Sequence, residues 1–122
     1  HPVPDTYFER TADEALRSDV YAEIFLFECE NEAAGYGLIA KTYSQEAGGM
    51  VWWIEEVYVR EAFRSKGIGR EFFAYLDKVK GSAVTRMRLE VEEDNTRAVA
   101  LYKKLGYKPL EYAQMIKDAP LK

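Results

Sequence analysis

Apolar and polar positions along the chain follow two regular spacings, which divide it into helices and strands. Apolar residues recur along one helix face in residues 5–19, 67–80 and 96–105, so three helices are predicted there. Strands are predicted where apolar residues cluster or alternate with polar ones, in residues 21–29, 35–43, 51–59, 84–92, 107–110 and 112–117. The polar turn at residues 30–32 predicts a hairpin between the first two strands.

The order of these elements predicts an α+β domain. A helix precedes antiparallel strands, a strand–helix–strand unit follows, and a helix and short strands end the chain. Such an order is typical of a mixed, mostly antiparallel sheet flanked by helices. The 122 residues suffice for one compact domain with a modest core and not for two, so we expect a single domain over residues 1–122.

Composition narrows the functional class. The net charge of −4 disfavours a general nucleic-acid or membrane-surface binder, which would need a basic face. The only cysteine is Cys29 and the only histidine is His1, which excludes an internal disulfide, a His-based triad and Cys or His metal sites. No segment has the length of a membrane span or the pattern of a secretory signal. We therefore expect a cytoplasmic protein that binds no metal, nucleic acid or membrane.

A glycine-containing loop is the first candidate binding site. The run Arg64–Gly69 (RSKGIG) comes directly after the strand 51–59 and leads into the helix 67–80. Glycine lets the backbone pass close to a ligand, and the first N–H groups of a helix are left unpaired at the positive end of its dipole. These features predict a phosphate or pyrophosphate site. Its residues would be Arg64, Ser65, Lys66, Gly67, Ile68, Gly69 and Arg70.

The alternative for this loop is a structural turn that binds nothing. Phe72 replaces the third glycine of the dinucleotide-binding pattern, and no Gly-Lys-Ser/Thr follows as it would in a P-loop. The loop by itself does not separate the two interpretations.

Four segments in order resemble the GNAT superfamily of acetyl-CoA-dependent N-acyltransferases. They are IEEVYV at 54–59, RSKGIG at 64–69, RMRLEVEE at 86–93 and DNTRAVALYKKLGY at 94–107. The resemblance implies a sheet splayed between the strands 51–59 and 84–92, with the pantetheine arm of the co-substrate acetyl-CoA in the gap. It also implies that backbone groups of Val57 and Val59 pair with that arm, and that the amides from Ser65 to Arg70 hold the pyrophosphate.

Glu55 and Glu56 are the candidate general bases. Amine acetylation needs a neutral amine, and a nearby carboxylate can bind the ammonium and take its proton. Neighbouring residues on a strand point to opposite faces, so only one of the two lines a cleft unless a bulge intervenes. The pair resembles the Glu-Asp pair of the polyamine and thialysine branch of the family, which implies Glu55 as the base and Glu56 as the second choice. A solvated or salt-bridged carboxylate is the alternative.

Asn95 and Tyr102 stand two turns apart on one face of the helix 96–105. Asn95 either caps that helix or bonds the cofactor arm. Tyr102 lies in an apolar stripe, so it is either a core residue or, as the resemblance implies, the acid that protonates the departing thiolate of coenzyme A. We favour the catalytic role, because the pKa of a phenol lies near or above that of a thiol.

Family members usually open with a strand and a helix that this chain, which starts without methionine, does not show. We therefore expect an N-terminally incomplete domain whose edge strand 21–29 is exposed. Missing residues, a homodimer formed through that edge, and strand exchange are the alternatives. The resemblance implies an N-acetyltransferase that acts on a small-molecule or protein amine. A non-catalytic acyl-CoA-binding module and a structural fragment are the competing interpretations.

Overall fold

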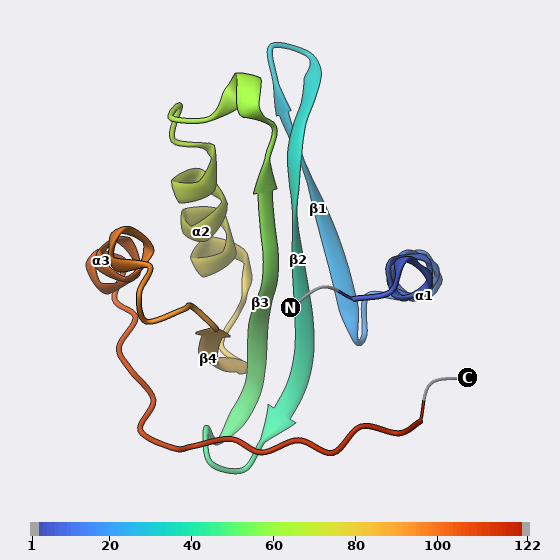
Figure 1. Ribbon diagram of the computed structural model, residues 1–122, viewed down its shortest axis with the longest axis vertical. Coiled ribbons are helices and arrows are strands. Elements are labelled where there is room, and N and C mark those ends of the chain that lie inside the picture. Colours follow the sequence, from blue (N-terminus) through green and yellow to red (C-terminus); the bar gives the residue numbers. More distant parts are fainter. Residues whose placement is uncertain (1–2, 121–122) are drawn as a thin grey trace. The chain divides into compact units, whose positions relative to one another are not determined.

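A computed structural model describes residues 3–120 (Figure 1). The elements are α1 (Asp5–Arg17), β1 (Ala22–Cys29), β2 (Glu32–Ser44), β3 (Gly49–Val59), the 3-10 helix η1 (Glu61–Phe63), α2 (Ile68–Val79), β4 (Val84–Leu89) and α3 (Thr96–Lys104). His1, the only histidine, lies outside the described residues. Contacts within the chain divide it into two compact units, residues 1–90 and 91–122.

The first unit is built on a four-stranded sheet in the order β1-β2-β3-β4. β1 pairs with β2 and β2 with β3 in antiparallel fashion, whereas β3 and β4 run parallel. Glu30 and Asn31 form the predicted hairpin turn, with left-handed φ angles of 54° and 66°. The predicted mixed, mostly antiparallel α+β fold is confirmed, and β1 is an edge strand of this sheet.

β3 and β4 pair over only part of their length. Their Cα partners run from Met50 with Val84 to Ile54 with Leu89, where β4 ends. β3 continues to Val59, and over this last stretch it pairs only with β2. The predicted splay between the two central strands is therefore present. β4 ends at Leu89 and is shorter than the predicted strand 84–92. Side chains continue to alternate in residues 90–92, but these residues have no hydrogen-bonding partner in β3.

One face of the sheet packs against α2 and forms the core of the first unit. The Phe72 ring is 4% exposed, and its centroid lies 5.5 Å from that of Phe25 and 5.1 Å from that of Phe27. Gly37 leaves the room for this ring, because a Cβ there would lie 2.4 Å from the Phe72 Cζ atom. The ring therefore fixes α2 against both β1 and β2.

Glycine ends both α2 and α3, as predicted. Gly81 follows α2 at φ 70° and Gly106 follows α3 at φ 98°, both in the left-handed region. After α3, the N–H of Tyr107 donates to the carbonyl of Tyr102 at 2.9 Å, and that of Gly106 to the carbonyl of Lys103 at 3.1 Å. These bonds satisfy the last carbonyls of the helix.

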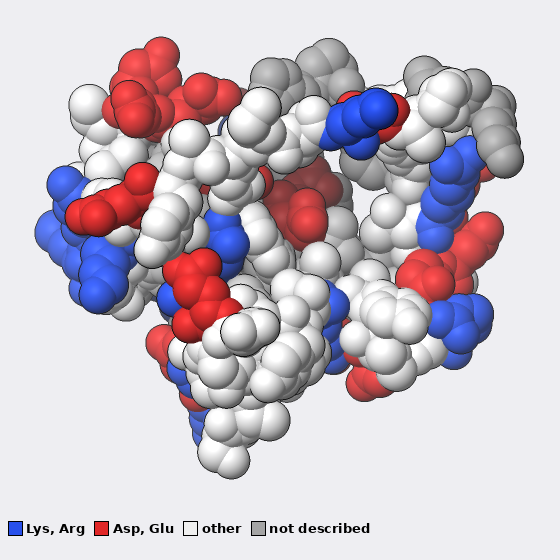
Figure 2. Space-filling model, turned by 90° about the horizontal axis from the view of Figure 1, so that it is seen from below, with Lys and Arg blue, Asp and Glu red and all other residues white. Residues whose placement is uncertain are grey.

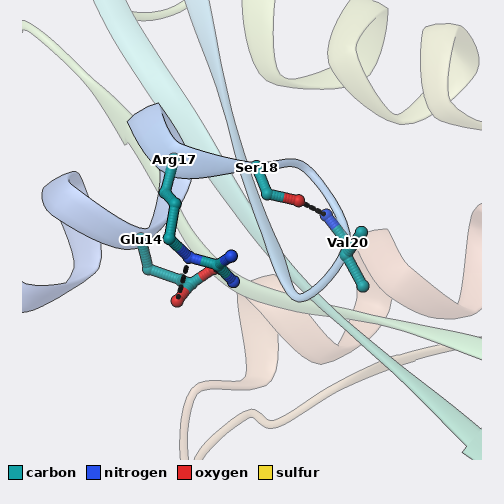
Figure 3. Close-up of polar contacts among 4 residues, drawn as sticks. All are labelled: Glu14, Arg17, Ser18 and Val20. Carbon is teal, nitrogen blue, oxygen red and sulfur yellow. Dashed lines mark hydrogen bonds and ion pairs between the residues drawn. The ribbon is translucent and has the colours of Figure 1, made fainter.

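α1 ends at Arg17, before the predicted Asp19. Ser18 is extended at φ −171°, and its Oγ accepts a hydrogen bond from the Val20 N–H at 3.0 Å (Figure 3). In the last turn, Nη2 of Arg17 donates to the Glu14 carboxylate at 2.7 Å. The helix stops here because the Ser18 side chain offers the backbone a turn in place of a further helical bond.

The prediction of short strands at residues 107–110 and 112–117 is wrong. Residues 107–120 form no helix or strand, and Met115 and Ile116 are 95% and 85% exposed. A strand needs a neighbour that takes its backbone hydrogen bonds, and a short apolar run does not supply one.

We expect Phe72→Ala to lower the free energy of unfolding by about 3–5 kcal/mol, because it opens a cavity in the core beside Gly37. Phe8→Ala in α1 removes the same ring from a side chain that is 52% exposed, and should cost less than about 1 kcal/mol. Urea denaturation followed by circular dichroism measures both losses. Equal losses would contradict the central place of Phe72 in the core.

Candidate functional site

The two candidate bases lie at a β-bulge in β3, where the regular pairing with β2 is interrupted. Ile54 is the Cα partner of Ile39, and Glu56 is the Cα partner of Leu38. Glu55 is therefore the extra residue of the bulge, with no partner of its own in β2.

The bulge changes the direction expected for Glu56. Gly37 faces Phe72 of α2, so the next residue, Leu38, faces the other side of the sheet. Glu56 shares that side with its partner Leu38. This is also the side of Glu55, which lines a cavity there, so both carboxylates lie on the face opposite α2.

The cavity around Glu55 has a volume of about 530 Å³. It is lined by Ala40, Thr42, Trp53, Ile54, Glu55 and Glu90. Partial burial raises the pKa of Glu55, and the negative charge of Glu90 raises it further. A carboxylate with a raised pKa holds a proton more tightly, which suits a group that takes one from an ammonium.

Glu56 is engaged by a tyrosine. Burial, together with a hydrogen bond to the Glu56 side chain, raises the pKa of Tyr36 to about 12. The Tyr36 hydroxyl therefore stays protonated at neutral pH and donates a hydrogen bond to the Glu56 carboxylate. The Tyr36 ring also packs against that of Tyr58, with centroids 5.8 Å apart. This arrangement favours Glu55 over Glu56 as a base.

The end of β3 has peptide groups that point away from β2. The Arg60 N–H donates to the carbonyl of Ala34 at 2.7 Å, which sets the alternation of bonded and non-bonded pairs along the β2–β3 ladder. In this alternation the N–H and C=O groups of Val57 and Val59 point to the side on which β4 has ended. The Val59 carbonyl accepts a bond from Nε of Arg64 at 2.9 Å. The peptide groups of Val57 are left open to an extended ligand.

The loop that leads into α2 carries a row of unpaired amides. Among residues 3–120, no protein group accepts a hydrogen bond from the backbone N–H groups of residues 65–70. The first bond of α2 runs from the Glu71 N–H to the Gly67 carbonyl at 3.0 Å. Ser65 and Gly67 adopt left-handed φ angles of 66° and 82°, and no side chain caps the helix. Exposed amides at a helix N-terminus fit an anion, as the sequence predicts.

The two glycines of this loop leave space that the protein does not fill. A Cβ at Gly67 or at Gly69 would have nothing within 4 Å. The positive φ accounts for glycine at Gly67. Gly69 lies inside α2, where neither conformation nor packing requires glycine. The open space at Gly69 would let a ligand such as a pyrophosphate approach the backbone closely, and this binding role stays a prediction.

Asn95 and Tyr102 lie in the second unit, on α3 and its N-cap. Oδ1 of Asn95 accepts a hydrogen bond from the Ala98 N–H at 3.2 Å, which confirms the capping interpretation; contact with the cofactor arm stays a prediction. Tyr102 is half-buried, with its ring centroid 6.1 Å from that of Tyr107. Partial burial raises the pKa of its hydroxyl, which therefore stays protonated at neutral pH.

The sequence pattern alone does not reveal the role of Glu90 in this site. Alternation places Glu90 on the polar face of the strand 84–92 but gives no reason to link it with Glu55. The link comes from the parallel register, because each residue directly follows one member of the last Cα pair, Ile54 with Leu89. No signal in a single sequence reports a parallel register of this kind.

The mixed sheet, open between β3 and β4, and the exposed amides at the start of α2 match the class of fold expected from the four segments. Residues 1–107 match the model of the acetyltransferase (GNAT) family. The chain belongs to this family.

Individual relatives agree with the family match. The chain is 30% identical to the thialysine N-ε-acetyltransferase of Bos taurus, in an alignment that covers 86% of this chain and 69% of that protein. A "possible acetyltransferase" from Clostridium difficile 630 has a similar structure, with a TM-score of 0.84 and 21% identity over 99% of this chain and 81% of that one. AAC(6′)-Iy in complex with the bisubstrate analogue CoA-S-monomethyl-acetylneamine gives a TM-score of 0.77 and 18% identity, over 96% of this chain and 82% of that one. These two structures share the fold.

Charges of both signs are interspersed over the surface drawn in Figure 2. Within residues 3–120, no group of three or more His, Cys, Asp or Glu side chains is arranged to hold a metal ion. No helix in this part of the chain is both long enough and apolar enough to cross a membrane.

We expect Gly69→Val to weaken acetyl-CoA binding by about tenfold or more, a loss of roughly 1.4 kcal/mol, because the new side chain blocks approach to the loop amides. Ala74→Val is the matched control, since Ala74 is an exposed position of the same helix. Isothermal titration calorimetry measures both affinities. If folded Gly69→Val protein binds acetyl-CoA as tightly as the parent, the pyrophosphate site lies elsewhere.

Proposed function

We propose that this chain transfers the acetyl group of acetyl-CoA to a primary amine, with Glu55 as the general base. The position of Glu55 carries the proposal: it lies on the bulge, in a cavity, directly after the last β3–β4 pair. The open edge of β3 at Val57 and Val59 follows, and η1 then leads to the loop 64–70. A base, an edge for an extended cofactor and an anion site therefore follow one another along the chain.

The proposed role of Glu55 is to deprotonate the acceptor. Bound acetyl-CoA supplies an activated acyl thioester that an amine lone pair can attack. An alkylamine is mostly protonated at neutral pH, so it must first lose a proton. Glu55 accepts that proton: the N–H bond breaks, an O–H bond forms on the carboxylate, and the nitrogen lone pair becomes free. The raised pKa of Glu55 lowers the free-energy cost of this transfer.

The proposed cofactor site uses mainly backbone groups. The amides from Ser65 to Arg70 would hold the pyrophosphate, and exposed Arg64, Lys66 and Arg70 would add positive charge. The peptide groups of Val57 and the N–H of Val59 would pair with the pantetheine arm along the edge that β4 leaves open, since the Val59 carbonyl already accepts a bond from Nε of Arg64. The unpaired amides and the open approach to Gly69 support this assignment.

The proposed acceptor carries a primary amine on a short aliphatic chain. The bovine relative is named for acetylation of the ε-nitrogen of thialysine. The 530 Å³ cavity beside Glu55 has room for such a chain, and its acidic lining suits an ammonium group.

Tyr102 is the proposed general acid, which gives its hydroxyl proton to the departing thiolate of coenzyme A. The phenolate regains a proton when the attacking nitrogen loses its second N–H proton and becomes an amide. The raised pKa of this hydroxyl supports the assignment, because the group carries a proton at neutral pH. The tyrosine keeps an uncharged resting state, which its half-buried position requires.

We expect Glu55→Gln to lower kcat at pH 7 by roughly 10²-fold, because the base is lost while the shape of the side chain is kept. The loss should shrink as the pH rises and free amine becomes available without help. Thiol release from acetyl-CoA with a panel of primary alkylamines measures the rates.

Stability and a distant acid provide the controls for Glu55→Gln. Because its pKa is raised on folding, ionisation of Glu55 opposes folding as the pH rises above the ordinary carboxyl range, so the Gln variant should not melt earlier at pH 7. Glu28→Gln, at an exposed position of β1, should leave kcat unchanged. A parent protein that binds acetyl-CoA but acetylates no amine of the panel would support the acyl-CoA-binding module instead.

We expect Tyr102→Phe to lower kcat by about 10²-fold with little change in acetyl-CoA affinity, since only the hydroxyl is lost. The ring stays in place against Tyr107, so the melting temperature should hold. Acyl donors with a more acidic thiol should recover part of the rate, because their thiolate needs a proton least. Normal turnover on coenzyme A thioesters would leave Tyr102 as a packing residue.

A further inference from the structure

Glu90 faces Glu55 across the point where the two central strands part. Ile54 of β3 and Leu89 of β4 are the last Cα partners, and Glu55 and Glu90 are the next residue of each strand. Both side chains line the same cavity. The parallel register and the bulge together place two carboxylates, one from each strand, at one opening.

The charges close to Glu55 and Glu90 decide what the pair can bind. Among residues 3–120, neither Glu55 nor Glu90 forms an ion pair with a lysine or arginine. Arg88 shares the polar face of β4 with Glu90, but its guanidinium lies 3.9 Å from the centroid of the Trp53 ring. A cation held on an aromatic face is oriented by that ring, and it leaves the two carboxylates facing each other.

The other charged groups nearby are also engaged. On the same face, Glu56 bonds the Tyr36 hydroxyl, and Arg86 pairs with Glu46 at 3.6 Å. Lys41 of β2 lies on the opposite face of the sheet, with Gly37, and pairs with Glu23 of β1 at 2.8 Å. Within residues 3–120, the cations of these pairs are therefore bound elsewhere, and Glu55 and Glu90 take part in no ion pair.

Two like charges at one opening raise each other's energy, and a cation between them removes that cost. The effect of Glu90 on the pKa of Glu55 reports this repulsion. An ammonium group has the opposite charge and three N–H donors, enough to bond both carboxylates at once. A neutral group of the same size would leave the repulsion in place.

We propose that Glu90 binds the ammonium group of the acceptor together with Glu55, and that this pair selects a cationic amine over a neutral molecule of the same shape. The role in turnover rests on the proposed acetyl transfer, whereas the binding step stands by itself. When the proton passes from nitrogen to Glu55, Glu90 keeps the amine at the opening through its hydrogen bond.

Binding of a small ammonium ion tests the proposal without the reaction. The probes are n-butylammonium and its neutral isostere 1-butanol, titrated into the whole chain at pH 7 and followed by NMR. The parent should bind n-butylammonium at least about tenfold more tightly than 1-butanol. Glu90→Gln should reduce that preference to about threefold or less, and Glu90→Asp should restore most of it. Glu28→Gln makes the same change in net charge at a distant position and should change nothing.

The outcomes separate this proposal from the proposed function. If Glu90→Gln binds n-butylammonium like the parent, or if the parent shows no preference over 1-butanol, the Glu90 proposal is wrong even where acetyl transfer is observed. If binding depends on Glu90 but no amine is acetylated, the proposed function fails and the ammonium site stands. In an active enzyme, Glu90→Gln should raise KM for n-butylamine by about tenfold while KM for acetyl-CoA stays constant. Melting curves identify any variant that fails to fold, and the Asp variant then decides through the same titration.

Discussion

The site depends on one interrupted set of backbone hydrogen bonds, the ladder between β3 and β4. The ladder stops at Ile54 and Leu89, although β3 runs on to Val59. A buried strand cannot leave its peptide groups unpaired without a large cost, so an open stretch must face water or a ligand. Every other feature of the candidate site is arranged around this opening: the acids at its start, the free peptide groups along it, and the loop amides beyond it.

The bulge at Glu55 and the opening of the sheet act on the same few residues. A regular strand would send one of two adjacent glutamates into the core face, against α2, where an ionised carboxylate is expensive. With the bulge, Glu55 and Glu56 share the polar face, and the Tyr36 hydroxyl takes Glu56. The bulge thus gives Glu55 and Glu56 different surroundings, although the two side chains are chemically identical.

How much of this could be predicted from the sequence depends on the range of the interactions involved. Helix ends at Gly81 and Gly106 and the hairpin turn follow from local rules, and they were predictable. The strands expected in residues 107–117 failed because pairing depends on a neighbour that no local pattern reveals. The proximity of Glu55 to Glu90 could not be predicted from the sequence for the same reason, because it arises from the parallel register of two strands separated by α2. The family and its loop were predictable because their residues are close together in the chain.

The contact between Gly37 and Phe72 determines the dimensions of the site. Because the Phe72 ring occupies the place of a Cβ on Gly37, α2 can approach β2 to a single depth. The Cα partner of Gly37 is Val57, so the contact that limits the approach of α2 lies next to the open edge of β3. A cofactor that binds at two points along one covalent chain requires a defined distance between those two points. The missing side chain at Gly37 thus links the packing of the core to the spacing between the loop amides and the β3 edge.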